Sequence, residues 1–479
     1  MTSPAVAFTH KLRFGNIPVD VVEQAKLCVV DLVGAAAAGS ETAMSRIIRD
    51  HAHQNFGSPK NGVRMLLDGR RTSLPGAALA GGITIDAFDS HDGHVLTKGH
   101  AGVAILPTLL GLCDPAARVS GREFLTSLVL GYEIAIRAGI ATHRTCADYH
   151  TSGSWNALGA AAIVARWLKL SPAITREALG IAEYHGPRSQ MMRCIDFPTM
   201  VKDGSGWGAM AGVSAALLAR DGFTGAPSLV SEAGDVADLW ADLGTRWRIM
   251  EMYFKPYPVC RWAQPPITAS LGLLAKHGID GSEVARIQVE TFHNGVRLAA
   301  RSPKTTEEAQ YSLPFPVAAA IVHGKVTARE IDGAGLKDPR VLKLAREMKL
   351  TEDLALTAAF PARRIARVTL ITRDGRVLRS EPTEALGDPE RPLGAAGILA
   401  KYRQTAEPIL GRARTERIAA EAAAMNGARA DARTLVELVL APVRKQRTSA
   451  PHSRTKRGGG PEWGPREARA GSKIAAAKR

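Results

Sequence analysis

Several residue patterns that define whole classes of enzyme are missing from this sequence of 479 residues. Its five cysteines are scattered and form no CxxC pair, so neither an iron–sulfur cluster, a zinc ribbon nor a disulfide framework is indicated. HExxH and the phosphate loop GxxxxGK[ST] are absent. No apolar run approaches twenty residues without a charge, and Met1–Ala5 is no signal-peptide start. We therefore expect a soluble, cytoplasmic protein without membrane contact.

Aromatic residues are also few, at 5% of the chain, whereas hydrophobic residues reach 45%. Alanine and glycine are abundant, and small side chains allow helices to pack closely. A chain of this length can hold two domains. The composition is typical of a mostly helical enzyme.

Positive charge is concentrated at the C-terminus. Of the net charge of +16, residues 444–479 carry +9, which leaves +7 for the preceding 443 residues. The end of the chain, Ser449–Arg479, is rich in Gly, Pro, Ala and Arg without any apolar period. We therefore predict a basic disordered tail over residues 443–479. It would bind polyanions weakly, and nucleic acid is not an expected partner otherwise.

Apolar residues recur at helical spacing over most of the first 268 residues. Pro18 and Ser171-Pro172 mark helix starts, and Ser120 with Glu123 forms a capping-box pattern. The predicted helices are Ile17–Ala38, Met44–His53, Pro75–Asp86, Val103–Leu112, Ser120–Gly139, Trp155–Leu170, Ser171–Glu183 and Gly204–Arg220, and Val63–Asp68 is predicted to be extended. We interpret this part as an all-α bundle.

The pattern changes in the second half of the chain. Val284–His293 alternates like a strand, and Arg363–Ser380 contains two β-rich runs around Asp374-Gly375, a strong hairpin signal. Helical stretches are predicted near Pro316–His323 and Pro339–Met348. We therefore predict a mainly α fold: a large all-α helical bundle domain (residues 1–268), an inserted smaller α+β lid domain (269–391) and a helical return to the first domain (392–442).

The strongest candidate for a site is Asp86–His100, which holds three Asp, three His and one Lys within fifteen residues. So many titratable groups are costly to desolvate unless they pair with each other or with a ligand. A solvated loop and a metal cluster are the alternatives. The spacing matches neither HExxH nor a Cys/His zinc pattern, and we predict no metal.

Three later segments carry a similar density of chemically special residues. Tyr149–Trp155 places His150 and hydroxyl groups before a helix, where anions bind, although the hydroxyls could instead cap that helix. Met200–Gly208 surrounds Lys202 with glycines that allow a ligand close to the backbone. Lys255–Arg261 has two prolines and could equally be a rigid interdomain linker.

Taken in order, these four segments resemble the MmgE/PrpD family, which includes 2-methylcitrate dehydratase, cis-aconitate decarboxylase and an iminodisuccinate epimerase. The motifs that carry the resemblance are Asp89–Asp92 with His100, Tyr149–Gly153, Lys202 with the small-residue helix after it, and Lys255–Cys260, with weaker matches at Gly222–Ala226 and Ser312–Ala318. The resemblance covers roughly Ala5–Leu440. It implies a helical domain with an α+β lid, a homodimer, and no required metal or organic cofactor.

The resemblance also has departures. The family's His-x-x-Asp-Phe-Asp-Asp is here Asp86-Ala87-Phe88-Asp89-Ser90-His91-Asp92. The usual His-Pro is His100-Ala101, and the Pro-Leu-His after the active-site Lys is Asp203-Gly204-Ser205. These changes bear on the substrate more than on the reaction type.

The family resemblance implies a small di- or tricarboxylate substrate and a base, an acid and fixed cations around it. We expect His100 or His150 to act as base, Asp89 to orient an imidazole, and the other histidine to return a proton. Lys202 would stabilise the developing charge. The expected catalytic residues are His100, His150, Asp89 and Lys202, and the expected substrate-binding residues are Asp92, Thr97, Lys98, Ser152, Lys255, Tyr257, Cys260 and Arg261.

The expected activity is that of a cofactor-independent lyase of the 2-methylcitrate dehydratase type. An epimerase, isomerase or decarboxylase acting on a related dicarboxylate is the alternative, because all these reactions pass through a carbanion-like centre. A non-catalytic binding protein on the same scaffold is a second alternative.

Overall fold

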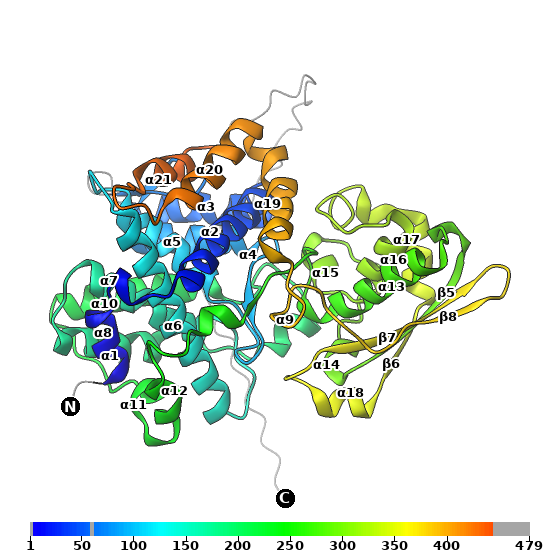
Figure 1. Ribbon diagram of the computed structural model, residues 1–479, viewed down its shortest axis with the longest axis horizontal. Coiled ribbons are helices and arrows are strands. Elements are labelled where there is room, and N and C mark those ends of the chain that lie inside the picture. The colour runs from blue at the N-terminus through cyan, green and yellow to red at the C-terminus, as the bar shows by residue number, and fades with distance from the viewer. Residues whose placement is uncertain (1–2, 58–61, 444–479) are drawn as a thin grey trace, which may run out of the picture. The chain divides into compact units, whose positions relative to one another are not determined.

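The computed structural model describes residues 3–57 and 62–443, which are mainly helical with few strands (Figure 1). The described residues belong to one compact unit. The predicted basic tail lies outside them, except for Val443.

Helices dominate the described chain up to about residue 250. Their bounds are α1 (Pro4–Lys11), α2 (Val19–Gly39), α3 (Ala43–Asn55), α4 (Leu74–Asp86), α5 (Gly102–Cys113), α6 (Gly121–Thr145), α7 (Gly153–Trp167), α8 (Pro172–His185), α9 (Met192–Asp196), α10 (Ser205–Arg220), α11 (Leu229–Glu232) and α12 (Ala237–Ala241). Four two-residue strands pair within this part: β1 (Val63–Arg64) with β2 (Arg71–Thr72), and β3 (Gly93–His94) with β4 (Met252–Tyr253).

Small residues set how closely these helices pack. Helix α10 lies against both α4 and α7, and α6 packs along α7. A Cβ atom at Gly82 of α4 would lie only 2.7 Å from the Cα atom of Gly206 of α10. This close approach brings the C-terminal end of α4, at Asp86, near the start of α10.

An α/β part follows. Its sheet has the order β6-β5-β7-β8, with β9 also paired to β7; β5 and β6 run parallel and the other pairs are antiparallel. The strands are β5 (Val284–Thr291), β6 (Lys349–Glu352), β7 (Ile365–Thr372), β8 (Val377–Arg379) and β9 (Thr383–Glu384), and the helices are α13 (Gln264–His277), α14 (His293–Val296), α15 (Thr306–Gln310), α16 (Pro314–His323), α17 (Pro339–Glu347) and α18 (Leu354–Ala359). Helix α13 packs on β7 and α17 on β5.

The chain ends in three helices, α19 (Gly394–Leu410), α20 (Arg412–Ala424) and α21 (Arg433–Leu440). Helix α19 packs along α2, and in Figure 1 these last helices lie beside the N-terminal ones rather than beside the sheet. Most buried apolar residues fall into two clusters, one built from the N- and C-terminal helices and the other centred on the α/β part. Phe88, next to Asp89, belongs to the second cluster.

The helix predictions are confirmed to within a few residues, except that α6 runs on to Thr145. Three details were wrong. The first 268 residues are not all-α, because β1–β4 lie there. Ser120 makes no capping hydrogen bond, and the Glu123 carboxylate pairs with Arg166. The parallel strand β6 was not anticipated. The division into domains stays a prediction.

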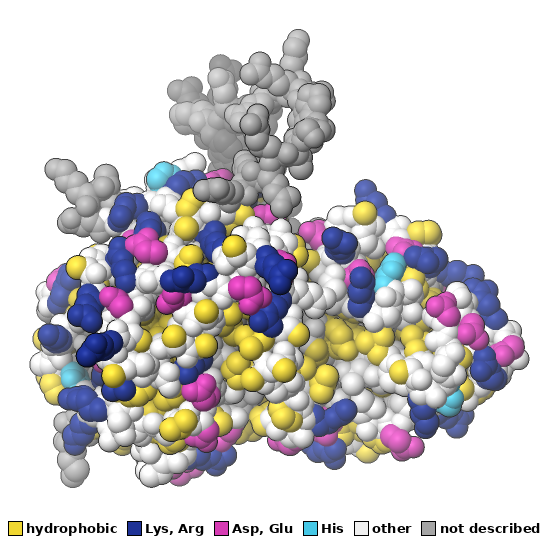
Figure 2. Space-filling view, turned by 45° about the horizontal axis from the view of Figure 1, so that its top comes forward, with side chains coloured by type: hydrophobic (Ala, Val, Ile, Leu, Met, Phe, Trp, Pro, Cys, Tyr) yellow, Lys and Arg dark blue, Asp and Glu magenta, His cyan; other side chains and the backbone are white. Residues whose placement is uncertain are grey.

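Helix α6 is the one described helix long and apolar enough to cross a bilayer, and its most apolar stretch is entirely buried inside the protein. Such burial is typical of a core helix. Figure 2 shows one face of the molecule, on which hydrophobic side chains gather in the middle and charged side chains are spread toward the ends.

Candidate active site

The site is organised around the loop between α4 and α5, residues 87–101. The β3–β4 pairing anchors it by placing Gly93 opposite Tyr253. A side chain at Gly93 would collide with the Tyr253 hydroxyl and with the His100 ring. The loop therefore lies directly against the segment that carries Lys255, which is 166 residues away in sequence.

A buried ion pair forms where these two segments meet. The Lys255 ammonium donates to Asp89 Oδ1 at 2.6 Å, and both side chains are at most 2% exposed. Burial alone would raise the pKa of Asp89, but the Lys255 and Lys202 ammonium groups hold it well below its ordinary value. Asp89 is therefore a carboxylate at neutral pH.

Lys202 reaches the same place from the turn before α10. Its ammonium donates to Gln310 Oε1 at 2.7 Å and lies 4.8 Å from the centre of the Tyr311 ring. Gln310 Oε1 also accepts from the Asp89 backbone N–H at 2.9 Å. Lys202 has a positive φ of 45°, a conformation that strains a non-glycine residue and is concentrated at functional sites. Within the described residues, Lys202 has no carboxylate within 4.0 Å.

Two imidazoles stand edge to face beside Asp89. The ring centres of His91 and His100 are 4.3 Å apart. His91 Nε2 is 3.4 Å from Asp86 Oδ1 and 3.7 Å from Asp89 Oδ1, yet both His91 ring nitrogens and Asp86 Oδ1 lack a hydrogen bond to any described residue. Buried polar atoms rarely stay unpaired. These unpaired atoms therefore mark a place where a ligand can bind or a proton can be transferred.

The His100 ring is held in one tautomer. Its Nδ1 is 2.5 Å from the Asp92 carbonyl oxygen, which can only accept, so the proton sits on Nδ1 and Nε2 keeps its lone pair. Burial, together with His91 and Lys255, lowers the pKa of His100 well below its ordinary value. A neutral His100 can act as a base at neutral pH.

A second chain of hydrogen bonds holds His100 from behind. Its backbone N–H donates to Ser152 Oγ at 2.9 Å, and Ser152 hydrogen-bonds to the Asp203 carboxyl group through both its hydroxyl and its N–H. Ser152 therefore makes no capping bond to α7. Burial, with Asp86 nearby, raises the pKa of Asp203 to about 8.

Asp92 faces away from Asp89, into the helical core. Its carboxyl group accepts from the Tyr132 hydroxyl, and burial together with Asp31 raises the pKa of Asp92 to about 7. Beside it, Lys401 of α19 pairs with Asp31 of α2 at 2.6 Å and donates to the Ser90 carbonyl oxygen. This region fixes the Ser90–Asp92 backbone rather than contacting Asp89.

Lys98, Arg261 and Arg364 gather around two tyrosines on another side of the loop. The guanidinium groups of Arg261 and Arg364 lie 4.6 and 5.4 Å from the centre of the Tyr253 ring, and the Lys98 ammonium lies 4.6 Å from that of Tyr149. The Tyr149 hydroxyl in turn donates to the Lys98 carbonyl oxygen.

The remaining predicted site residues have other surroundings. His150 Nε2 lies 3.5 Å from Arg188 Nη2, the His150 backbone N–H donates to His143 Nε2, and burial and Arg188 lower the pKa of His150. The Thr97 hydroxyl donates to backbone oxygens of its own loop. The backbone of Tyr257 accepts from Gln264, and Cys260 is buried with its pKa raised to about 12. Their predicted roles stay predictions.

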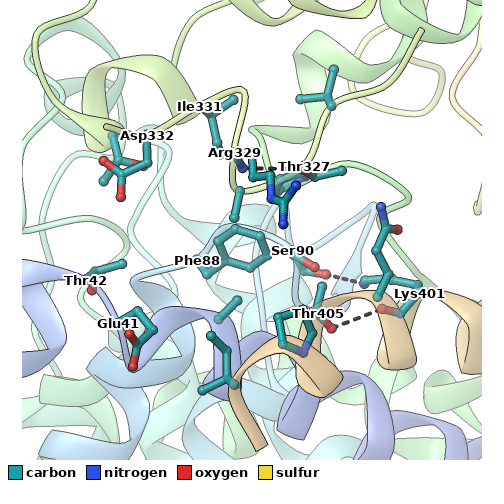
Figure 3. A pocket seen from close by; sticks show the side chains of 18 of the residues that line it. Glu41, Thr42, Phe88, Ser90, Thr327, Arg329, Ile331, Asp332, Lys401 and Thr405 are labelled. Atoms are coloured by element: carbon teal, nitrogen blue, oxygen red, sulfur yellow. Dashed lines mark hydrogen bonds between the residues drawn. The ribbon is translucent and has the colours of Figure 1, made fainter. Parts of the chain in front are cut away.

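Two cavities adjoin the Asp89 cluster. One, of about 830 Å³, is lined by Asp86, Thr151 and Lys202 together with residues of the 187–207 segment. In the other, of about 450 Å³, Phe88, Ser90 and Lys401 face Arg329 and neighbouring residues of the α/β part (Figure 3). The first cavity adjoins Lys202 and Asp86, so we take it as the candidate substrate cavity.

Among the residues that the structure describes, one group could ligate a metal ion. Possible ligand atoms of Asp89, His91 and His100 all lie within 4.8 Å of one another. A cation there would meet the Lys255 ammonium, already 2.6 Å from Asp89 Oδ1. The Asp89 cluster suits proton transfer and anion binding, because the ammonium groups of Lys255 and Lys202 already supply its positive charge.

Sequence reasoning missed several members of the cluster. Asp86 and His91 lie inside the recognised segment, but no role was assigned to them. The signal was visible, because the family pattern has His at the position of Asp86 and Asp at the position of His91. Gln310 and Tyr311 directly precede the weak Ser312–Ala318 match. Tyr253 and Arg364 carried no local signal, because only the β3–β4 pairing and the start of β7 bring them to the loop.

Comparison with known proteins places these residues in a family context. The family model for the MmgE/PrpD N-terminal domain matches residues 5–241, and that for the C-terminal domain matches residues 257–426.

Individual relatives are more distant. A cis-aconitate decarboxylase of Aspergillus terreus is 22% identical over 87% of this chain and 91% of its own, and the human cis-aconitate decarboxylase is 22% identical over 84% and 86%. The cis-aconitate decarboxylase-like protein oryM of Aspergillus oryzae is 28% identical, but this match spans only about half of either chain, 47% of this one and 48% of oryM. With both domain models matched in order, the chain belongs to the MmgE/PrpD family.

Proposed function

We propose that this chain is a cofactor-independent lyase that removes a proton from a carbon next to a carboxylate of a small di- or tricarboxylic acid. The observation that carries the proposal is the position of a neutral imidazole, His100, within a buried cluster that also holds the ammonium groups of Lys202 and Lys255. Base and cations thus share one desolvated site.

In the proposed mechanism, His100 Nε2 takes the proton, because Nδ1 is committed to the Asp92 carbonyl oxygen. The negative charge that develops on the carboxylate is stabilised by Lys202, whose only described polar partner is the neutral Gln310 amide. Lys255 is shared with Asp89 and keeps that carboxylate ionised beside the imidazoles. His91, 3.4 Å from Asp86, is placed to return a proton.

The first candidate reaction is dehydration of the 2-methylcitrate dehydratase type. Loss of a hydroxyl group requires an acid, and the Asp203 carboxyl group, with its pKa near 8, keeps a proton at neutral pH next to Ser152 and the His100 backbone. Decarboxylation is the second candidate, favoured by relatives named as cis-aconitate decarboxylases over more than four fifths of this chain. Epimerisation would use the same carbanion-like centre.

The test is proton exchange in deuterated water, followed by NMR, over a panel of 2-methylcitrate, citrate, cis-aconitate and an aminated dicarboxylate. Exchange at a carbon next to a carboxylate is expected for the true substrate, and the product separates elimination, decarboxylation and inversion. His100→Asn should abolish exchange. If the wild-type enzyme, at any concentration, exchanges no proton on any acid of the panel, the proposal is contradicted.

A non-catalytic protein that binds polyanions through its basic tail is the alternative of a different class. A chain that ends at about Leu440 should lose polyanion binding and retain any lyase activity. Polyanion binding by the full chain, without turnover of any acid in the panel, favours the alternative.

We also propose that the chain forms a homodimer. Five large apolar side chains around the candidate substrate cavity are exposed by 41–73%: Ile47, Phe197, Met200, Val201 and Trp207. Exposed apolar patches of this kind mark protein interfaces. Light scattering should give twice the chain mass, and Val201→Glu with Phe197→Glu should shift it toward the monomer; a monomeric wild type contradicts this.

A further inference from the structure

Arg364 is a buried cation without a counter-charge. The residue immediately precedes β7, is 4% exposed, and makes a single described polar contact, in which Nη2 donates to the Val95 carbonyl oxygen at 3.2 Å. Its Nε and Nη1 atoms are buried and have no hydrogen-bond partner. Among the residues that the structure describes, no carboxylate lies within 4.0 Å of this guanidinium group, unlike Arg261, which has Asp388 at 2.7 Å.

Lys98 stands in the same neighbourhood and is only half-buried. Its ammonium group lies over the Tyr149 ring, and no described carboxylate lies within 4.0 Å of it. Burial and the nearby Arg364 charge lower the pKa of Lys98. Its positive φ of 51° is a left-handed conformation that is uncommon for a non-glycine residue. The charge of Arg364 therefore acts on Lys98, and neither side chain has a described carboxylate within 4.0 Å.

A buried, unpaired charge costs several kcal/mol, so a fold retains one only where something compensates it. The tyrosines contribute part of this through cation–π contacts, roughly 0.5–2 kcal/mol each. Nη2 keeps one hydrogen after its bond to the Val95 carbonyl oxygen, so one bidentate edge of the guanidinium group stays free, and a planar carboxylate matches that edge.

We infer that Lys98 and Arg364 form a carboxylate-binding subsite of the active site, which holds a substrate carboxylate remote from the reacting carbon. The inference rests on the proposed function for the identity of the ligand. Two observations connect the subsite with the Asp89 cluster. The centre of the Tyr253 ring lies 5.4 Å from the Arg364 guanidinium group and 6.4 Å from the centre of the His100 ring. The charges of Lys255 and Arg364 both counteract the rise in the pKa of the Cys260 thiol. A substrate with two or three carboxylates can therefore be held at both ends.

This arrangement makes specificity depend on the α/β part. Lys98 comes from the loop between α4 and α5, whereas Arg364 comes from the chain just before β7. A carboxylate bound between them would hold these two segments together. Selection of a long substrate over a short one would then follow from the distance between this subsite and Lys202, rather than from the proton-transfer residues themselves.

The test is binding of tricarballylate, a tricarboxylate with no hydroxyl group to eliminate, measured by titration calorimetry on the full chain. Arg364→Gln should raise its Kd roughly ten- to hundredfold, the value of one or two charge-assisted hydrogen bonds. Arg364→Lys should be intermediate. The matched control is Arg363→Gln, whose side chain is 61% exposed and pairs with Glu384; it should leave the Kd within about twofold.

Stability of the unliganded protein separates binding from packing. Removing an uncompensated charge should leave the thermal midpoint of Arg364→Gln at or above that of the wild type. A lower midpoint with an unchanged Kd assigns Arg364 to structure and overturns the subsite, as does a wild type that does not bind millimolar tricarballylate. Because calorimetry needs no turnover, failure of the exchange assay would overturn the proposed function without deciding this result.

Discussion

Two buried lysines in this molecule differ in the partners of their ammonium groups. Lys401 pairs with the Asp31 carboxylate at 2.6 Å and with the Ser90 carbonyl oxygen, so its charge is compensated within the helical core. Lys202 is buried to the same degree or more, but its described partners are a neutral amide and an aromatic ring. The difference indicates that Lys401 has a carboxylate in direct contact, whereas Lys202 acts on the Asp89 carboxylate only through space and keeps its ammonium group open to a bound anion.

The largest effect is expected from removing Lys401, the lysine that has a carboxylate in direct contact. Lys401→Met should destabilise the protein by about 3–5 kcal/mol, because it leaves the fully buried Asp31 without its partner. Chemical denaturation should show the loss. The double variant Asp31→Leu with Lys401→Met should recover most of it, since no buried charge remains. A single variant as stable as the wild type would show that Lys401 is no more compensated than Lys202.

Removing the uncompensated lysine should have the reverse outcome. Lys202→Met should leave the unfolding transition nearly unchanged and lower turnover by roughly 10²–10³-fold, as does loss of one group that stabilises developing charge. Steady-state kinetics on the substrate identified by exchange is the measurement. Lys276→Met, on the last turn of α13, is the surface control. Loss of stability without loss of turnover would reverse the assignment.

The next prediction concerns the Asp86–His91 pair within the Asp89 cluster. His91→Asn and Asp86→Asn should each reduce turnover roughly ten- to hundredfold if the pair works as one proton-transfer unit. Exchanging the two residues, Asp86→His with His91→Asp, keeps the 3.4 Å contact in reversed order and should restore activity above either single variant. Additive losses in the exchanged variant would mean that the two residues act independently.

Much of this layout was accessible from sequence. The helices, the hairpin around Asp374-Gly375 and the family followed from periodicity and from four ordered motifs, and four of the predicted residues, Asp89, His100, Lys202 and Lys255, do lie in or beside one buried cluster. Local pattern could not reveal which side chains face one another. His150 stands in the expected segment, yet its ring contacts Arg188, whereas Ser152 two positions later holds His100.

The residues that escaped prediction depend on long-range pairing. Arg364 reaches the site only because β7 pairs with β5 in the middle of the sheet, and Tyr253 only because it lies opposite Gly93. Such partners have no spacing rule in the sequence. The parallel strand β6 escaped for the same reason, since its four residues pair with β5 across more than fifty intervening positions.

The last prediction concerns pH and the acid behind His100. Because burial raises the pKa of Asp203 to about 8, the folded protein holds a proton there that the unfolded chain releases near pH 4. Between these values the native state binds more protons, so this group makes stability fall as pH rises from about 4 to 8. Asp203→Asn should flatten that slope while preserving the hydrogen bond from the Ser152 N–H. Denaturation midpoints at pH 5 and 8 are the measurement, and Asp221→Asn on the exposed surface is the control. An unchanged slope in Asp203→Asn would place a carboxylate, not an acid, beside Ser152, and would remove the proton that dehydration requires of this site.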